Sequence, residues 1–89
     1  MHRTTEQFRR RYRDLPEEVR DAADKSFHLL KENPQHPSLQ FKKVGAFWSA
    51  RIGLAHRALA VKDGHNYIWV WIGKHDDYEN MISKRKPRG

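Results

Sequence analysis

The chain has 89 residues, the length of one small domain, and contains no cysteine, so neither disulfides nor a cysteine-rich zinc site can stabilise it. Hydrophobic residues make up 37% of the chain and include three Trp, three Tyr and four Phe, enough for a small aromatic-rich core. No apolar run approaches the roughly 20 residues that cross a membrane, and the first residues lack the apolar stretch of a signal peptide. We therefore expect a cytoplasmic protein with no membrane partner.

The charge is strongly positive and unevenly distributed. Lys and Arg total 18 against 11 Asp and Glu, for a formal net charge of +7. Residues 1–38 contribute +1, whereas residues 39–89 contribute +6. This asymmetry is typical of a scaffold followed by a binding surface for a polyanion, either nucleic acid or an acidic protein that imitates it. A basic soluble protein without a specific anionic partner is the alternative.

Two helices are predicted in the first half of the chain. Apolar residues at helical spacing occur in residues 5–14, and Pro16 ends that helix and suits the first turn of the next one. The second helix is expected to stop at Asn33-Pro34, and the two form a hairpin. The apolar stripe of the first helix is Phe8, Tyr12 and Leu15, and that of the second is Val19, Ala22, Ala23, Phe27 and Leu30.

The apolar period then changes from about 3.6 residues to 2, which predicts strands. Four short runs occupy residues 39–44, 47–52, 55–61 and 67–72, and their short links favour an antiparallel meander. The hairpin can cover only one face of such a sheet. We assign Ile68, Val70 and Ile72 to the helix side, and Tyr67, Trp69 and Trp71 to the opposite face.

A short helix from about Asp76 and a basic tail at residues 84–89 complete the chain. The tail is either a solubilising frayed end or a nucleic-acid contact. We therefore expect one α+β domain over residues 1–83: an N-terminal helical hairpin packed on one face of a four-stranded, mainly antiparallel twisted sheet, with a short C-terminal helix.

Several short motifs occur in a fixed order. They are Phe8-x3-Tyr12-x2-Leu15-Pro16, Asn33-Pro34-x-His36-Pro37-Ser38-Leu39, Trp48-Ser49-Ala50-Arg51-Ile52-Gly53, Arg57-Ala58-Leu59 and Trp71-Ile72-Gly73-x-His75-x2-Tyr78. With this length and charge, the set resembles the RelE/ParE superfamily of bacterial toxins from type II toxin–antitoxin systems, over nearly the whole chain. The resemblance implies the fold expected above and a cognate antitoxin. In the RelE-like branch, which we favour, it also implies cofactor-free cleavage of messenger RNA in the ribosomal A site. Many members begin with a β-strand; only about four residues precede the first helix here, so that strand is expected to be short or missing.

Metal-free RNA cleavage needs a proton acceptor for the 2′-hydroxyl, a cation for the phosphorane charge and a proton donor for the leaving 5′-oxygen. His75 directly follows the last predicted strand, and histidine exchanges protons near neutral pH. It is the first candidate, and the resemblance implies a catalytic basic or imidazole residue after the same strand. The alternative is a histidine that neighbouring carboxylates hold at a helix start.

Three further residues complete the expected site. Arg51 alternates with Trp48, Ala50 and Ile52, so it should point away from the helices; it suits a phosphate, as the resemblance implies, or an antitoxin carboxylate. Arg57 either binds phosphate or braces the sheet through an internal salt bridge. Tyr78 lies one helical turn after His75, so both could face one cavity; core packing is the alternative for Tyr78.

The remaining candidates carry less chemistry. His36 and His56 are secondary catalytic candidates. Phe47, Trp69 and Trp71 could stack on bases, although Trp in a small sheet more often serves core packing or an antitoxin groove. The histidine spacing fits no metal site, and no cofactor is expected. The expected RNA-binding residues are Lys42, Lys43, Lys74, Lys84, Arg85 and Lys86.

The leading hypothesis is a toxin that cleaves messenger RNA on the ribosome, with antitoxin, ribosome and messenger RNA as partners. One alternative is a ParE-like inhibitor of DNA gyrase, and another is a degenerate toxin that keeps only antitoxin binding. His75, Arg51 and Tyr78 favour the nuclease, because an inhibitor needs no acid–base groups.

Overall fold

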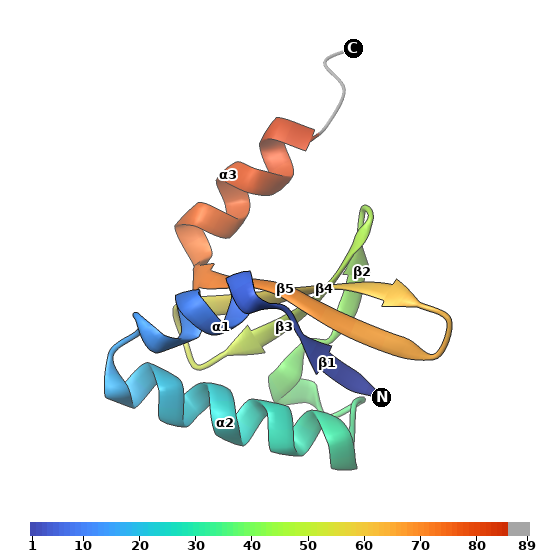
Figure 1. Ribbon diagram of the computed structural model, residues 1–89, viewed down its shortest axis with the longest axis horizontal. Coiled ribbons are helices and arrows are strands. Elements are labelled where there is room, and N and C mark those ends of the chain that lie inside the picture. Colours follow the sequence, from blue (N-terminus) through green and yellow to red (C-terminus); the bar gives the residue numbers. More distant parts are fainter. Residues whose placement is uncertain (86–89) are drawn as a thin grey trace.

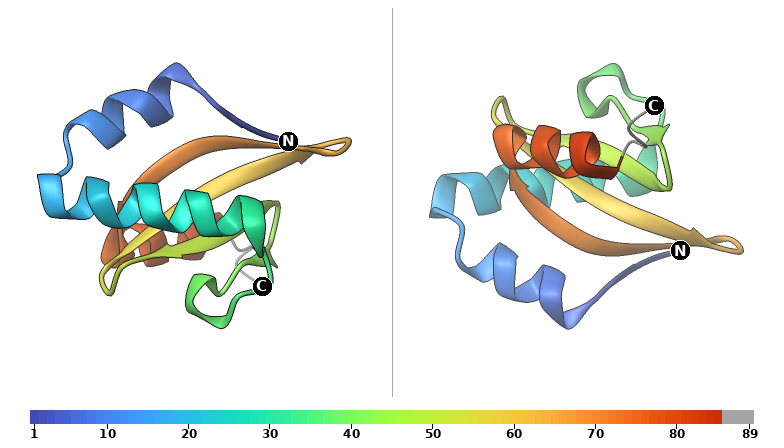
Figure 2. Two further views of the ribbon diagram at one scale, coloured as in Figure 1. Left: turned by 90° about the horizontal axis from the view of Figure 1, so that it is seen from below. Right: turned by 90° about the horizontal axis from the view of Figure 1, so that it is seen from above.

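The computed structural model describes the backbone of residues 1–85 and the side chains of residues 1–80. A five-stranded sheet separates α2, on one face, from α3, on the other, and α1 flanks β5 (Figures 1 and 2). The elements in chain order are β1 (His2–Thr4), α1 (Glu6–Arg13), α2 (Glu17–Glu32), the 3₁₀ turn η1 (Pro37–Leu39), β2 (Lys42–Val44), β3 (Phe47–Ile52), β4 (His56–Asp63), β5 (Asn66–Lys74) and α3 (His75–Arg85).

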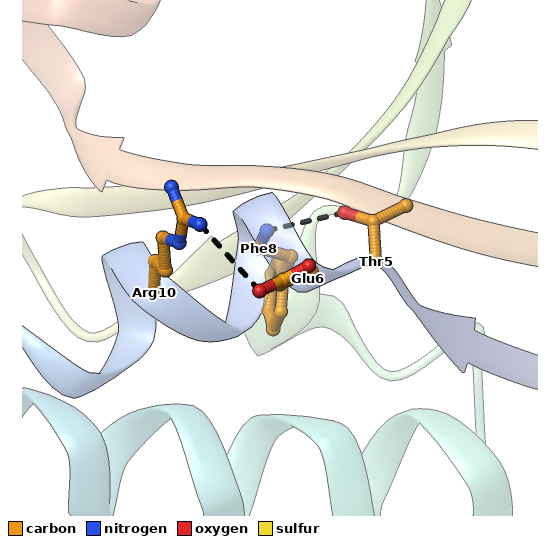
Figure 3. A network of polar contacts seen from close by, with 4 residues as sticks. All are labelled: Thr5, Glu6, Phe8 and Arg10. Atoms are coloured by element: carbon orange, nitrogen blue, oxygen red, sulfur yellow. Dashed lines mark hydrogen bonds and ion pairs between the residues drawn. The ribbon is translucent and has the colours of Figure 1, made fainter.

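Both helices of the predicted hairpin are confirmed, and the local sequence explains their ends. Thr5 caps α1, because its Oγ1 accepts a hydrogen bond from the Phe8 N–H at 3.1 Å (Figure 3). Glu6 lies at the positive end of the helix dipole and 3.5 Å from the Arg10 guanidinium, one turn further along (Figure 3). α2 begins after Pro16 and ends before Asn33-Pro34.

The sheet has the order β1-β5-β4-β3-β2, and β2 to β5 form the predicted antiparallel meander. The expectation of four strands is wrong by one. His2–Thr4 forms the short first strand, which runs parallel to β5. Its three residues are too few and too polar to give an apolar alternation. Backbone bonds hold β1, including one from the Tyr67 N–H to the Met1 carbonyl at 2.8 Å.

The first predicted strand is shorter than expected, because residues 37–39 form η1. Leu39 is buried in this turn, and Gln40, which follows it, has φ 44° and ψ 44°. This left-handed backbone interrupts the extended chain, so β2 begins only at Lys42. The strands expected at residues 47–52, 55–61 and 67–72 are confirmed, the last two with slightly wider bounds.

A β-bulge in β5 changes which side chains share a face. Leu59 lies opposite Trp71, but the next residue of β4, Ala60, lies opposite Trp69. Val70 is therefore an extra residue between two pairs, and the alternation reverses on either side of it. A sequence pattern of period 2 contains no sign of this insertion.

The bulge overturns part of the predicted face assignment. Ile72 packs on the side of α2, as expected. Trp69 and Tyr67 also pack there, contrary to the prediction, and Trp69 is fully buried. Val70 instead packs against the cluster on the opposite face, and Ile68, opposite Val61 of that cluster, shares its face. The predictions for these four residues are therefore wrong.

The two faces carry separate apolar clusters, which we call the α2 face and the α3 face. The buried residues of the α2 face are Phe8, Ala23, Leu30, Leu39, Ala50, Ile52, Ala58, Ala60, Trp69 and Ile72, and those of the smaller α3-face cluster are Phe47, Leu59, Trp71 and Tyr78.

None of the helices in the described part of the chain has the length and apolar character to span a bilayer.

Candidate functional site

The strand register places two arginines side by side on the α3 face. Arg51 of β3 lies opposite Arg57 of β4, which lies opposite Gly73 of β5. Residues opposite one another in a sheet share a face, so Arg51 points away from α2, as predicted. Two like charges at opposite positions destabilise a sheet unless an anion lies near them. This row is therefore a local concentration of positive charge.

Two nitrogens of the Arg57 guanidinium donate no hydrogen bond to any of the described residues. Its Nη2 donates to Gln40 Oε1 at 3.0 Å, and its guanidinium lies over the Tyr78 ring, 5.3 Å from the centroid. Its Nε and Nη1 are buried without a hydrogen-bond partner in the described part of the chain. The described residues also give Arg57 no ion pair, so the alternative of an internal salt bridge finds no support there. Buried donors without acceptors cost free energy, which an anion would recover.

Arg51 is only half-buried and keeps most of its donors. Its Nε donates to the Gly53 carbonyl at 3.0 Å, across the turn that follows β3. That bond holds Nε, the guanidinium nitrogen nearest the aliphatic part of the side chain. The two terminal nitrogens remain available and can donate side by side to two oxygens of one phosphate. Arg51 and Arg57 thus lie at opposite register positions on one face, with Nε and Nη1 of Arg57 buried.

His75 and Tyr78 lie together at the start of α3. The His75 N–H donates to the Ala55 carbonyl at 2.8 Å, which fixes the start of the helix. The two ring centroids lie 5.7 Å apart, so the two side chains are neighbours, but Tyr78 belongs to the buried α3-face cluster, in agreement with the core-packing alternative. The His75 side chain is 43% exposed, with Nε2 3.4 Å from Glu79 Oε1, whereas Tyr78 is 6% exposed. His75, Tyr78 and Arg57 therefore form a continuous series of contacts.

His36 and His56 lie outside this series. His36 Nδ1 accepts the Ser38 N–H at 3.2 Å and caps η1, a structural task. His56 lies opposite Ile52 and Lys74, on the α2 side of the sheet end. Burial and the Lys74 charge lower the pKa of His56. It nevertheless lines a small hollow of about 160 Å³ together with His75, so it lies next to the site without facing Arg57.

The predicted RNA-binding lysines do not all lie on the α3 face. Lys42 lies opposite Ser49 and shares the face of Arg51, whereas Lys43 lies opposite Trp48 on the α2 face. Lys74 lies opposite His56 and therefore also lies on the α2 face of the sheet. The side chains of Lys84 and Arg85, and all of Lys86 with the rest of the 86–89 tail, lie outside the described residues.

The aromatic candidates for base stacking are mostly covered. Trp69 lies under α2 and is fully buried, which excludes base stacking in this structure; Trp71 is 6% exposed. The Arg11 guanidinium covers Trp71 at 5.0 Å from its centroid, and Arg11 Nε donates to the Ile72 carbonyl at 2.9 Å. Gly73 is required beside them, because a Cβ there would lie 2.6 Å from Trp71 Cζ2.

The sequence did not single out Arg11, Gly73 or Gln40. A glycine inside a strand pattern is a signal of close approach and could have drawn attention to Gly73. Gln40 and Arg11 reach the site only through the fold. In the described residues, no three His, Cys, Asp or Glu side chains lie close enough together to hold a metal ion.

Comparison with protein-family models gives no match, and neither does comparison with curated proteins. Solved structures do match. A RelB–RelE antitoxin–toxin complex from Methanococcus jannaschii has a TM-score of 0.69 at 12% identity, over 89% of this chain and 96% of that chain. A RelBE toxin–antitoxin complex from Mycobacterium tuberculosis has a TM-score of 0.63 at 21% identity, over 84% and 96%. A variant of the E. coli toxin RelE in the free state has a TM-score of 0.64 at 13% identity, over 97% of each chain. The chain therefore has the fold of RelE toxins, as the sequence resemblance implied.

Proposed function

We propose that this chain is the toxin of a type II toxin–antitoxin pair and that it cleaves messenger RNA on the ribosome. The observation that carries the proposal is Arg57, whose buried Nε and Nη1 have no partner in the described residues. An anion with several acceptor oxygens would satisfy them, and a phosphodiester is such a group. The fold of RelE toxins and the nearby imidazole and phenol support the same conclusion.

The roles of the side chains follow from the chemistry of the reaction. The RNA 2′-oxygen attacks the adjacent phosphorus, and His75 accepts the 2′-hydroxyl proton. Glu79, 3.4 Å from His75 Nε2, stabilises the resulting imidazolium. Arg51 and Arg57 balance the phosphorane charge. The bond to the 5′-oxygen then breaks, and the Tyr78 phenol protonates that oxygen. The products are a 2′,3′-cyclic phosphate and a 5′-hydroxyl end.

Access to Arg57 requires a movement of Tyr78. The ring lies over the guanidinium, and the unpartnered nitrogens are shielded from solvent. Arg51 is the more exposed cation and meets the phosphate first. Displacement of the ring then opens Arg57 and brings the phenol to the edge of the bound phosphate, so Tyr78 acts both as cover and as proton donor.

An acidic antitoxin is the expected protein partner. The chain carries +7 overall, and β2 is an edge strand whose Lys42 and Lys43 are exposed. An extended segment with carboxylates and apolar anchors could pair with that edge and mask the α3 face. Raising the salt concentration should slow association of the two proteins more than it accelerates dissociation. Co-expression with the neighbouring reading frame and co-purification test this pairing.

The test of the proposed function compares two histidines that each contact a glutamate one helical turn further along. His28 contacts Glu32 at 3.2 Å on α2, as His75 contacts Glu79 on α3, and both pairs are spaced four residues apart. His75→Ala should slow cleavage of messenger RNA on ribosomes by roughly 10² to 10⁴-fold. His28→Ala should cleave like the unmodified chain.

Other outcomes would reject the proposal. Equal cleavage by both variants would remove His75 from the site. DNA breaks in cells that express the chain, while translation continues, would indicate a gyrase inhibitor instead of a nuclease.

A further inference from the structure

Gln40 is the partner that the described residues provide for the Arg57 guanidinium. Its exposed side chain accepts from Arg57 Nη2 at 3.0 Å, across 17 positions of sequence. Arginine has only donors, so the amide must turn its oxygen toward it. Arg57 makes no other hydrogen bond in the described part of the chain, because its Nε and Nη1 are unpartnered. Of the hydrogen bonds in the described part of the chain, this one alone orients the guanidinium in its plane.

The backbone of Gln40 is unusual. Among the described residues, Gln40 is the one non-glycine residue with a positive φ, which is 44°. Glycine adopts this conformation without strain, whereas a residue with a Cβ does not. Strained backbone persists where the surrounding structure uses it. Here the left-handed backbone of Gln40 ends η1 and brings its side-chain amide to Arg57 of β4. An extended backbone at this position would instead continue into β2.

The Gln40 bond leaves Arg57 able to bind a phosphate with two parallel bonds. Nη2 carries two N–H groups, and Gln40 uses one of them. The remaining N–H lies beside either Nε–H or Nη1–H, according to which hydrogen Gln40 accepts, so one of the two possible forks stays open. Without Gln40, rotation about the terminal bonds of the side chain would spread this fork over many orientations, because the Tyr78 ring restrains only its plane.

We propose that Gln40 is a positioning residue that orients Arg57 toward the scissile phosphate, a role that rests on the function proposed above. Gln40 does not touch the substrate. It fixes the fork of Arg57 before RNA arrives, and its strained backbone is what brings its amide within reach.

Gln40→Gly separates this role from a structural one. Glycine removes the amide and relieves the left-handed strain, so thermal stability should be unchanged or higher. Cleavage on the ribosome should nevertheless fall by about 10- to 100-fold, because Arg57 loses its orientation. Gln35→Gly, in the exposed turn after α2, is the control and should cleave normally. A purely structural Gln40 would lose stability and activity together, and wild-type cleavage by Gln40→Gly would overturn the proposal.

A double-mutant cycle tests whether Gln40 acts through Arg57. Adding Gln40→Gly to Arg57→Ala should cause no further loss, since the group to be positioned is absent. An additional loss equal to that of the single variant would contradict the proposal.

An NMR measurement keeps the inference separate from the proposed function. The Arg57 Nε–H signal should report an ordered side chain in the unmodified protein and a mobile one in Gln40→Gly. If the unmodified chain does not cleave RNA, the proposed function fails, but a loss of order in Gln40→Gly still supports the positioning role. Equal order in both proteins would overturn it.

Discussion

The two faces of the sheet differ in how completely their polar groups are satisfied. On the α2 face, the buried Trp69 ring packs edge-on against Phe27 at 5.0 Å between centroids, and its indole N–H donates to His2 Nδ1 at 3.0 Å. On the α3 face lie all three buried side-chain polar atoms that lack partners in the described residues, which are Ser49 Oγ, Arg57 Nε and Arg57 Nη1. The buried polar groups of the α2 face therefore have partners within the described residues, whereas these three atoms of the α3 face do not.

This contrast fits a division in which the α2 face stabilises the domain and the α3 face carries the proposed function. Apolar burial with satisfied polar groups is what stabilises a domain of this size. Unpaired arginine donors at the opposite face reduce stability, and such costs persist in proteins mainly at sites that bind or react. Substitutions on the two faces should therefore affect different measurements.

The largest effect is expected on the α2 face. Trp69→Ala should lower the free energy of unfolding by about 3–5 kcal/mol, because it leaves a cavity under α2 and removes the donor to His2. Total stabilities of small domains are about 5–15 kcal/mol, so much of the fold would be lost. Urea unfolding measures this, with Leu54→Ala, at a residue 91% exposed, as the control. A loss of unfolding free energy no greater than that of Leu54→Ala would show that the packing of the α2 face does not stabilise the domain as expected.

Arg57→Met should give the opposite pattern. Methionine retains an apolar side chain under Tyr78 and removes the unpaired donors, so the unfolding free energy should be equal or higher. Cleavage on the ribosome should fall by about 10² to 10³-fold with the loss of the phosphate-binding group. A destabilised variant with normal cleavage would show that Arg57 braces the sheet.

Gly73→Ala tests how closely the α3 face is packed. The new Cβ would lie 2.6 Å from Trp71 Cζ2 and 3.1 Å from Arg11 Nη2, so the indole must shift and its contact with Arg11 must change. Forcing extra atoms into a packed site costs about 1–3 kcal/mol. Near-ultraviolet circular dichroism and urea unfolding report the shift and the cost. An unchanged spectrum and stability would mean that the face has room around Trp71.

The smallest effect concerns His2 and pH. Burial, then the N-terminal amine, then Lys31 lower the pKa of His2 below its ordinary 6.5. The unfolded chain therefore binds the proton more readily, so the stability from neutral His2 is present above about pH 6.5 and is lost as pH falls toward the folded pKa. His2→Gln, whose amide oxygen can still accept from Trp69, should flatten this dependence. An equally steep dependence in His2→Gln would leave His56, with its lowered pKa, as the source.

Much of the fold could be predicted because local chemistry determines it. Pro16 and Asn33-Pro34 mark the helix ends through backbone sterics that act within a few residues. The short first strand, β1, and the bulge at Val70 depend on pairing between segments far apart in sequence, which a period of 2 does not encode. Tyr67, Ile68, Trp69 and Val70 were therefore assigned to the wrong face of the sheet.

The site was predictable to the same extent. The alternation of β3 correctly placed Arg51 on the face away from α2, and the helical spacing placed Tyr78 beside His75. The contact between Gln40 and Arg57 was not predictable, because it depends on a left-handed residue and on a register that only the folded sheet defines.

The proposed mechanism uses the RNA 2′-hydroxyl as nucleophile, so replacing that one group in the RNA should abolish cleavage. Purified protein is added to ribosomes programmed with a messenger RNA that carries ribose, or one 2′-deoxyribose, at the cleaved nucleotide. The ribose message should yield a fragment ending in a 2′,3′-cyclic phosphate, and the deoxy message should remain intact. Equal cleavage of both messages, or fragments that begin with a 5′-phosphate, would rule out this mechanism.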